Sequence, residues 1–468
     1  MLRLIDPSLH GRREFLRVGG LALGGLGMGG MGLDQLLATR SALAQTSANI
    51  RDKSVVFLFL HGGPPQTETF DPKMDMPSGI RSVQGEVKTT LSGVTFGAGL
   101  PKLARLAHQL SIVRSFTPGD AGHNIKPIVC NDTFGANLGS VVARLTGTNH
   151  PTTGMPTNVA LFPRAIDEGA QPRVKAFGDF LSTGSLGEAY APFVPGAGGD
   201  LQQDMELQLP RARLGDRRTL LESLDRWRAT AEKKAAHGRL NRFQEQALQT
   251  ILGGVSEAFD LSLEDPRTVE RYDTSPLVPP AKIDKRWQNR KNYIDNAKTL
   301  GKLLLMARRL CERGCGFVTV TTNFVWDFHA DSNNATAKEG MYYCGVPFDH
   351  AVSAFLEDLE ARGLSEKILL VACGEMGRTP KLNARGGRDH WGRLGPLLLA
   401  GGGLNMGQVI GQSTRDAGEP ASEPITKKHL IATILHTLFD VGTLRIQRGI
   451  PTEIVRAMET DDPIPGLL

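Results

Sequence analysis

The fold is decided by an apolar run at residues 54–60, SVVFLFL, which leads into the turn sequence HGGPP at residues 61–65. A nearly uninterrupted apolar run is typical of a strand that is buried on both faces, as in the centre of a parallel sheet. The glycines and prolines that follow allow the chain to bend sharply where this strand ends. We therefore expect a central strand whose carboxyl end carries His61.

Strand-like and helix-like stretches alternate on both sides of a more polar middle region. Apolar runs predict further strands at residues 111–116, 158–162, 316–322, 367–373 and 395–400. Helical spacing of apolar residues predicts helices at residues 100–110, 138–145, 293–313, 346–362 and 425–439. This alternation predicts an α/β fold with a doubly wound, mostly parallel sheet and right-handed crossovers.

The middle region differs in character from the rest of the chain. Strand-like runs disappear from about residue 200, and charged, helix-forming stretches replace them. We interpret residues 200–300 as a helical insertion, which separates an N-terminal part of the α/β domain at 45–199 from a C-terminal part at 301–468. The basic residues of the insertion are best explained as a solvated helix face.

The N-terminus carries an export signal. Residues 11–17, GRREFLR, contain a twin-arginine pattern, and a glycine-rich apolar stretch and the small-x-small motif ALA at residues 42–44 follow. We expect residues 1–44 to be a cleaved signal peptide, with the twin-arginine export machinery as a partner and the periplasm or the exterior as the destination. An uncleaved anchor is the alternative. We expect no stable membrane span, because no later segment has the roughly 20 consecutive apolar residues that a spanning helix needs.

Composition narrows the classes of function. The 468 residues include 54 Lys and Arg against 49 Asp and Glu, a net charge of +5, and part of the excess lies in the leader. The mature chain is therefore close to neutral and is not expected to bind nucleic acid. Five cysteines, an odd number, argue against a disulfide framework. Cys311 and Cys315 are better explained as core residues than as half of a zinc site.

Polar side chains follow several of the predicted strands. His61 ends the first strand, His123 lies in the loop after the second, and Asp327 and His329 follow the strand at residues 316–322. In an extended chain Asp327 and His329 point to the same side, and a carboxylate with an imidazole suits Zn, Mn or Fe. We expect these two residues to be metal ligands, with His61 and His123 as catalytic candidates. An ordinary Asp–His hydrogen bond is the alternative.

A second group of candidates lies further along the chain. Glu375 and Arg378 follow the strand at residues 367–373, and Arg378 could hold an oxyanion in a bidentate manner. The alternative is a Glu–Arg pair that pins the loop. Asp389 and His390, in a glycine-rich loop, are expected to form a second metal half-site. His436, in the last predicted helix, is either a further metal ligand or a core histidine.

The roles of several other polar residues can be interpreted in more than one way. Glu68 and Asp71 either ligate a metal or anchor their loop. Ser115 and Thr117 are weak candidates for a nucleophile, because no neighbouring base is evident. The HGG sequence at residues 61–63 would suit the oxyanion hole of a serine esterase, which also needs a G-x-S-x-G elbow. The nearest match to that elbow is GVSEA at residues 254–258.

Several of these segments together resemble one known family. The twin-arginine leader, the strand that ends in GGP, TFDPK at 69–73, WDFH at 326–329, GEMGRTP at 374–380 and GRDHW at 387–391 resemble the exported family called domain of unknown function 1501. That family looks related to the alkaline phosphatase and sulfatase superfamily, whose members hydrolyse phosphate or sulfate esters on an α/β sheet, often with two metal ions. The resemblance implies an alkaline-phosphatase-like sheet. It also implies that Asp327 with His329, Asp389 with His390, and the late His436 are the metal ligands.

We therefore expect an exported, metal-dependent hydrolase of sulfate or phosphate esters. Its substrate would be a small-molecule or polysaccharide ester, and its cofactor a divalent ion such as Zn, Mn or Ca. Two alternatives stay open: a non-catalytic exported binding protein on the same fold, and a serine esterase.

Overall fold

The computed structural model describes residues 50–196, 255–444, 450, 454–455 and 462–468. The expected signal peptide at residues 1–44 lies outside the described residues, as does much of the expected insertion, from 197 to 254. Within the described part of the chain, no helix combines the length and the apolar character needed to cross a membrane.

The centre of the molecule is a seven-stranded sheet with the order β12-β4-β11-β8-β1-β7-β6. β1 (Ser54–Phe59) lies between β8 (Ile368–Cys373) and β7 (Phe317–Val320) and is parallel to both, with Val56 opposite Val318 and Leu370. β6 (Asn158–Leu161) continues the parallel pairing beside β7. Every residue of β1 is buried, which confirms the predicted central strand.

One strand reverses the direction of its neighbours. β11 (Leu397–Gly401) is antiparallel to both β8 and β4 (Leu110–Val113), and β12 (Gln408–Ile410) is parallel to β4. The connection from β8 to β11 forms a small hairpin of β9 (Gly377–Arg378) and β10 (His390–Trp391) instead of a crossover helix. Without a crossover the chain must return antiparallel. The hairpin therefore stays at the carboxyl end of β8, and the sheet is mostly parallel, as predicted.

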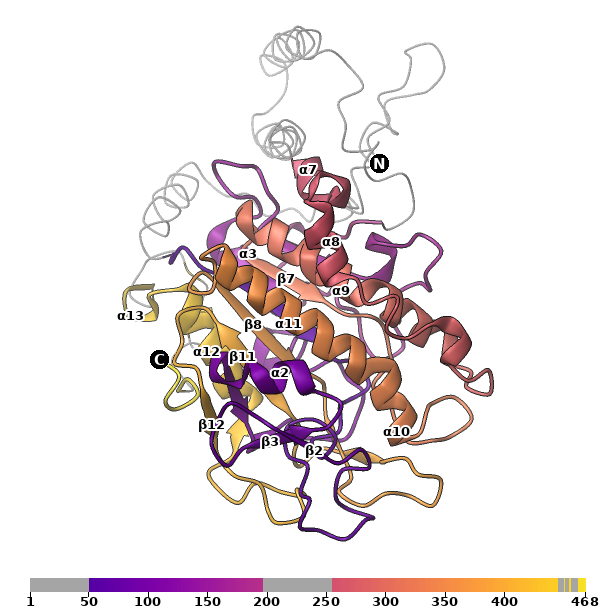
Figure 1. Cartoon of the computed structure of the whole chain (residues 1–468). Helices are drawn as coiled ribbons and strands as arrows, with labels where there is room; N and C mark the ends of the chain where they lie inside the picture. Colours follow the sequence, from indigo (N-terminus) through magenta and orange to yellow (C-terminus); the bar gives the residue numbers. More distant parts are fainter. Residues whose placement is uncertain (1–49, 197–254, 445–449, 451–453, 456–461) are drawn as a thin grey trace, which may run out of the picture.

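Helices cover both faces of the sheet (Figure 1). The side chains of β1 alternate between two cores: Val56 and Leu58 pack beneath α9 (Arg290–Glu312) and α11 (Val346–Ala361), whereas Val55 and Phe57 face α3 (Leu138–Thr146) and α12 (Lys427–Leu438). This alternation explains why the β1 sequence is apolar at every position. The smaller elements are α2 (Pro101–Arg105), α7 (Val255–Phe259), α8 (Pro266–Tyr272), α10 (Ala337–Gly340), α13 (Val441–Leu444), the hairpin of β2 (Glu86–Lys88) and β3 (Thr95–Gly97), and the pair of β5 (Phe116–Thr117) and β13 (Ile425–Thr426).

Three predictions differ in detail. The expected strand at residues 111–116 is divided between β4 and β5, and the expected helix at residues 100–110 is α2 followed by a 3-10 turn at Ala107–Gln109, with Leu110 already in β4. Residue 300, the expected end of the insertion, falls inside α9. α9 packs against β7 and β1, so this helix belongs to the layer that covers the sheet.

Candidate metal centre

Loops from separate parts of the chain meet at the carboxyl end of the parallel strands. Asp327 follows β7, Glu375 follows β8, His390 begins β10, and His123 lies in the loop after β5. Glycine allows these loops to touch: Gly62, after β1, has φ +112°, and a Cβ there would lie 2.6 Å from the backbone nitrogen of Asp327. A side chain at this position would push the β1 loop away from the loop that carries Asp327.

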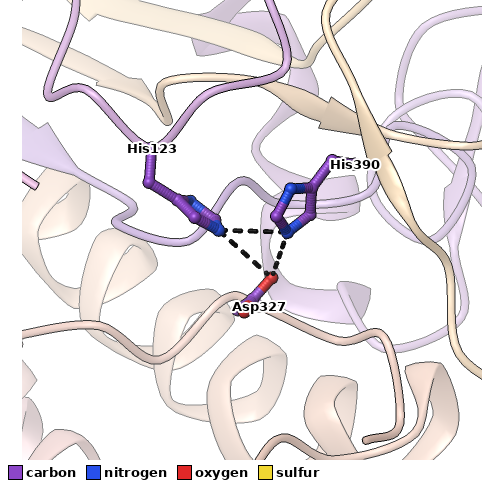
Figure 2. Close-up of side chains that lie close together, drawn as sticks. All are labelled: His123, Asp327 and His390. Carbon is purple, nitrogen blue, oxygen red and sulfur yellow. Dashed lines mark hydrogen bonds and ion pairs between the residues drawn. The ribbon is translucent and has the colours of Figure 1, made fainter.

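Three side chains converge at this edge (Figure 2). His123 Nε2 lies 3.0 Å from His390 Nε2 and 3.7 Å from Asp327 Oδ1, and His390 Nε2 lies 3.2 Å from the same oxygen. We call this group the triad. Asp327 is buried, His123 is largely buried, and the side chain of His390 is 36% exposed. The triad therefore lies at the surface end of a buried polar network.

The geometry of the triad fits a metal ion. Ligand atoms about 2.0 to 2.1 Å from a tetrahedral metal lie roughly 3.4 Å from one another, and the three separations in the triad fall on both sides of this value. Two imidazole nitrogens and one carboxylate oxygen suit Zn, Mn or Fe. Elsewhere among the described residues, no set of three His, Cys, Asp or Glu side chains is arranged in this way.

Glu375 fixes the orientation of His123. The Glu375 carboxylate is fully buried; it accepts hydrogen bonds from His123 Nδ1 at 2.7 Å and from the Gly62 backbone nitrogen at 2.9 Å. Because an ionised carboxylate can only accept, the ring hydrogen of His123 is on Nδ1, and Nε2 presents its lone pair to the triad. A carboxylate behind a histidine in this manner is typical of metal sites. Glu375 thus lies behind the triad and does not face solvent.

The placement of Arg378 corrects its expected role. Its guanidinium is fully buried and donates to the carbonyl oxygens of Gly62, Gly63 and Arg388 and to Asp327 Oδ1. Nε and both terminal nitrogens are thus used within the protein, so Arg378 is not placed to hold a substrate oxyanion. It is instead a positioning residue for Asp327 and for the loop after β1.

Asp327 is held ionised. Its second oxygen, Oδ2, accepts hydrogen bonds from His329 Nε2 at 2.8 Å and from Asn334 Nδ2 at 2.9 Å. Burial raises the pKa of Asp327, but the positive charge of Arg378 and the hydrogen bonds of His329 and His390 outweigh it and hold that pKa well below its usual range. The carboxylate is therefore an anionic ligand at neutral pH.

His329 lies beside the triad, on the other oxygen of Asp327. Its ring centroid is 5.3 Å from that of His390, and the hydrogen bond to Asp327 raises its pKa against the opposing effect of burial. Asn334 was not expected here. It lies in a polar run, DSNN at residues 331–334, and nothing in that run distinguishes it from a surface loop.

The structure places Asp389 and His436 outside the triad. The Asp389 carboxylate is exposed and accepts a hydrogen bond from Asn383 Nδ2 at 2.9 Å, because successive side chains point to opposite sides where the chain enters β10. His436 lies on α12, where burial, and then the charge of Arg51, lower its pKa. Arg51 precedes β1, whose six residues span about 20 Å, and the triad lies beyond the other end. The predicted ligand roles of both residues are corrected accordingly.

His61 lies close to the triad but is enclosed by aromatic rings. It is 1% exposed, and neither ring nitrogen has a hydrogen-bond partner among the described residues. Burial lowers its pKa to about 4, so the ring is neutral at neutral pH. The enclosing rings, with centroids 5.0 to 5.8 Å away, are Phe59, Phe177, Phe180 and Phe324.

Glu68 and Asp71 anchor loops. Glu68 and Arg388 are both fully buried and paired at 2.7 Å, which fixes the loop two residues before His390. Asp71 contacts Lys73 at 3.2 Å and the hydroxyl of Ser413. The anchoring interpretation of the two carboxylates is therefore the one that the structure supports.

One family model matches most of the chain. The chain belongs to the family described as "Protein of unknown function (DUF1501)", whose model matches residues 52–445. The predicted family membership is thereby confirmed. The search of curated proteins matched no relative.

Two solved structures are distantly similar to this chain. The PsFucS1 sulfatase from Pseudoalteromonas sp. is 10% identical with a TM-score of 0.36, over 87% of this chain and 72% of that chain. A structure related to the metabolism of multiple glycosaminoglycans by Bacteroides thetaiotaomicron is 10% identical with a TM-score of 0.35, over 86% of this chain and 74% of that chain. Similarity at this level carries no information about substrate or mechanism.

Proposed function

We propose that this protein is an exported, metal-dependent hydrolase of sulfate or phosphate esters. The observation that carries the proposal is the triad, whose three ligand-type atoms lie 3.0 to 3.7 Å apart at the carboxyl edge of the sheet. Open α/β sheets bind their ligands at this edge.

The residues of the chain have distinct parts in this proposal. His123, Asp327 and His390 would hold the ion, Glu375 keeps the hydrogen of His123 on Nδ1, and Arg378 keeps Asp327 ionised and in place. When bound, a divalent ion would supply a Lewis acid for an ester oxygen and lower the pKa of a bound water. His390, the most exposed member of the triad, lies on the side from which a substrate would approach.

Charge favours an anionic substrate. Among the buried groups of the centre, the carboxylates of Asp327 and Glu375 are only partly offset by Arg378. A divalent ion would add two positive charges to these buried groups, which would favour the approach of a sulfate or phosphate group. The ester would be that of a small molecule or a polysaccharide.

A non-catalytic binding protein on the same fold is the second candidate. One observation favours it: the expected anion grip, Arg378, is used entirely within the protein. The serine-esterase alternative has no such support. Ser256 lies on α7, which packs against α9 near the amino end of β7, whereas the triad lies beyond the carboxyl ends of the strands.

The location is proposed from the sequence alone. The twin-arginine pattern at Arg12 and Arg13 would direct the protein to the periplasm or the exterior. Replacing both residues with Lys should leave the full-length chain in the cytoplasm, as fractionation and immunoblotting would show. Unchanged export of this variant would contradict the proposal.

Metal analysis with a matched pair of histidine variants tests the enzymatic proposal. The mature protein is exposed separately to Zn, Mn and Ca, dialysed, analysed for bound metal and assayed with an aryl sulfate and an aryl phosphate. We expect His390→Ala to lose both metal and turnover, and His436→Ala, a histidine remote from the triad, to keep both. A wild-type protein that stays metal-free would end the proposal. Metal binding without turnover of any ester would favour the binding protein.

A further inference from the structure

Two phenylalanine rings lie directly beside the triad. Phe177, in the segment after β6, and Phe324, after β7, have ring centroids 4.7 Å apart. Their centroids lie 4.9 and 4.7 Å from that of His123, whose Nε2 belongs to the triad. Two separate loops thus bring an aromatic pair, Phe177 and Phe324, to one side of the candidate metal centre.

This aromatic pair remains partly exposed, unlike the aromatic residues around it. Phe59, Phe162 and Phe180 are each less than 5% exposed, whereas Phe177 and Phe324 are only half-buried. Folding normally removes such apolar surface from water, at about 25 cal/mol for each Å². A partly exposed aromatic pair next to a polar centre is typical of a ligand-binding site.

The side chains beside His390 are polar. The half-buried His329 has its ring centroid 5.3 Å from that of His390, and the exposed Asp389, adjacent to His390 in the chain, is bonded to Asn383. A substrate that reaches the triad therefore meets an apolar surface beside His123 and a hydrophilic surface beside His390. An ester with an anionic group and a flat apolar group matches this division.

We propose that the aromatic pair binds a ring in the alcohol part of the ester, so that esters of ring-bearing alcohols are preferred over alkyl esters. This inference rests on the proposed function of the triad. An aromatic ring stacks on phenylalanine at centroid distances of about 4.5 to 7 Å, and the C–H face of a pyranose ring also presents a flat apolar surface. The aromatic pair lies within 5 Å of the His123 ring, so a stacked ring places its ester oxygen next to the triad.

Binding of matched anions tests this inference without relying on turnover. Phenylphosphonate, methylphosphonate and a glucose sulfate are titrated into the metal-loaded mature protein in a calorimeter. We expect phenylphosphonate to bind about 2- to 12-fold more tightly than methylphosphonate, which is the range for one aromatic contact. Phe177→Ala and Phe324→Ala should remove this preference, so that the two phosphonates bind with equal affinity. The glucose sulfate shows which kind of ring the aromatic pair binds. If the same variants lose its binding, the pair binds a pyranose ring, and if they retain it, the pair binds an aryl ring.

Two further variants separate ring recognition from folding. Phe324→Leu keeps apolar volume over His61 but removes the flat ring, and it should lose the preference as Phe324→Ala does. Phe193→Ala is the control, since Phe193 is also half-buried and pairs with a phenylalanine, Phe259, but lies beside the amino end of β6. Equal affinity of the wild type for both phosphonates, or a preference that survives in all three site variants, overturns the inference.

The same samples report separately on the proposed function. Metal content is measured in each protein before titration. A chain that takes up no metal contradicts the hydrolase, whereas a metal-loaded chain that binds both phosphonates equally contradicts only the inference about the aromatic pair.

Discussion

Replacing Glu375 with Gln tests the hydrogen bond that orients His123. In the wild type, Glu375 accepts from both His123 Nδ1 and the Gly62 nitrogen, at 2.7 and 2.9 Å. Both donors reach Oε1, and the Gly62 nitrogen also lies 3.1 Å from Oε2, so a glutamine turns its NH2 group toward Gly62 alone in one orientation and toward both donors in the other. If it meets His123, the ring hydrogen moves to Nε2 and points into the triad, where it blocks metal binding.

The size of the effect follows from the position of Glu375 behind a ligand. Removal of a carboxylate in this position weakens metal binding about 10- to 100-fold, or roughly 1.4 to 2.7 kcal/mol. Zinc affinity is measured by competition with a chromogenic chelator. The stabilisation of the fold by a fixed excess of zinc should fall by the same amount, which a denaturant titration with and without zinc measures.

Asp389→Asn is the matched control for this experiment. It neutralises an exposed carboxylate that is adjacent to His390 in sequence but bonded to Asn383. Its zinc affinity should stay within about twofold of the wild type. The reasoning would be refuted by a Glu375→Gln protein with wild-type affinity, or by an Asp389→Asn protein as impaired as Glu375→Gln is expected to be.

Three further predictions concern buried ionisable groups. Burial lowers the pKa of His61 from 6.5 to about 4, so on acidification the unfolded chain binds a proton at His61 before the folded chain does, and stability falls as the pH drops from 6.5 to 4. His61→Phe should flatten the dependence of the unfolding free energy on pH in that window, and an unchanged slope would contradict the prediction. Glu68→Gln leaves Arg388 buried without its anion and should cost roughly 3 kcal/mol in urea unfolding, whereas a cost below about 1 kcal/mol would show that the carbonyl partners suffice. Burial opposes ionisation of Glu264, yet the arginines around it, including Arg308 at 2.7 Å, lower its pKa to about 2. The stabilisation of the fold by these ion pairs is present above pH 4.5 and is lost as the pH falls toward 2, so Glu264→Gln should unfold more easily at pH 7 and lose less stability on acidification.

Much of the fold could be predicted because its signals are local. A strand that is covered by helices on both faces must be apolar at every position, and β1 shows this pattern directly. The direction of β11 could not be predicted in this way. An apolar run predicts a buried strand but does not indicate whether that strand is parallel or antiparallel to its neighbours. Its orientation depends on the connection from β8, which folds as the hairpin of β9 and β10.

The candidate site was only partly predictable. His123, Asp327 and His390 were each selected because they follow strands or lie in glycine-rich loops. Their grouping was not predicted: the sequence favoured pairs of near neighbours, Asp327 with His329 and Asp389 with His390. The structure instead joins residues from three separate loops, and Asp389 turns away.

By itself, the sequence determined which strand is central, that the sheet is mostly parallel, and that imidazoles and carboxylates gather at its carboxyl edge. These features depend on the periodicity and position of residues along one segment. Only the tertiary structure decided that Glu375 stands behind His123 and that Arg378 is buried against Asp327. Those assignments depend on how loops far apart in the chain pack together, and close packing at positions such as Gly62 fixes a geometry that no local pattern contains.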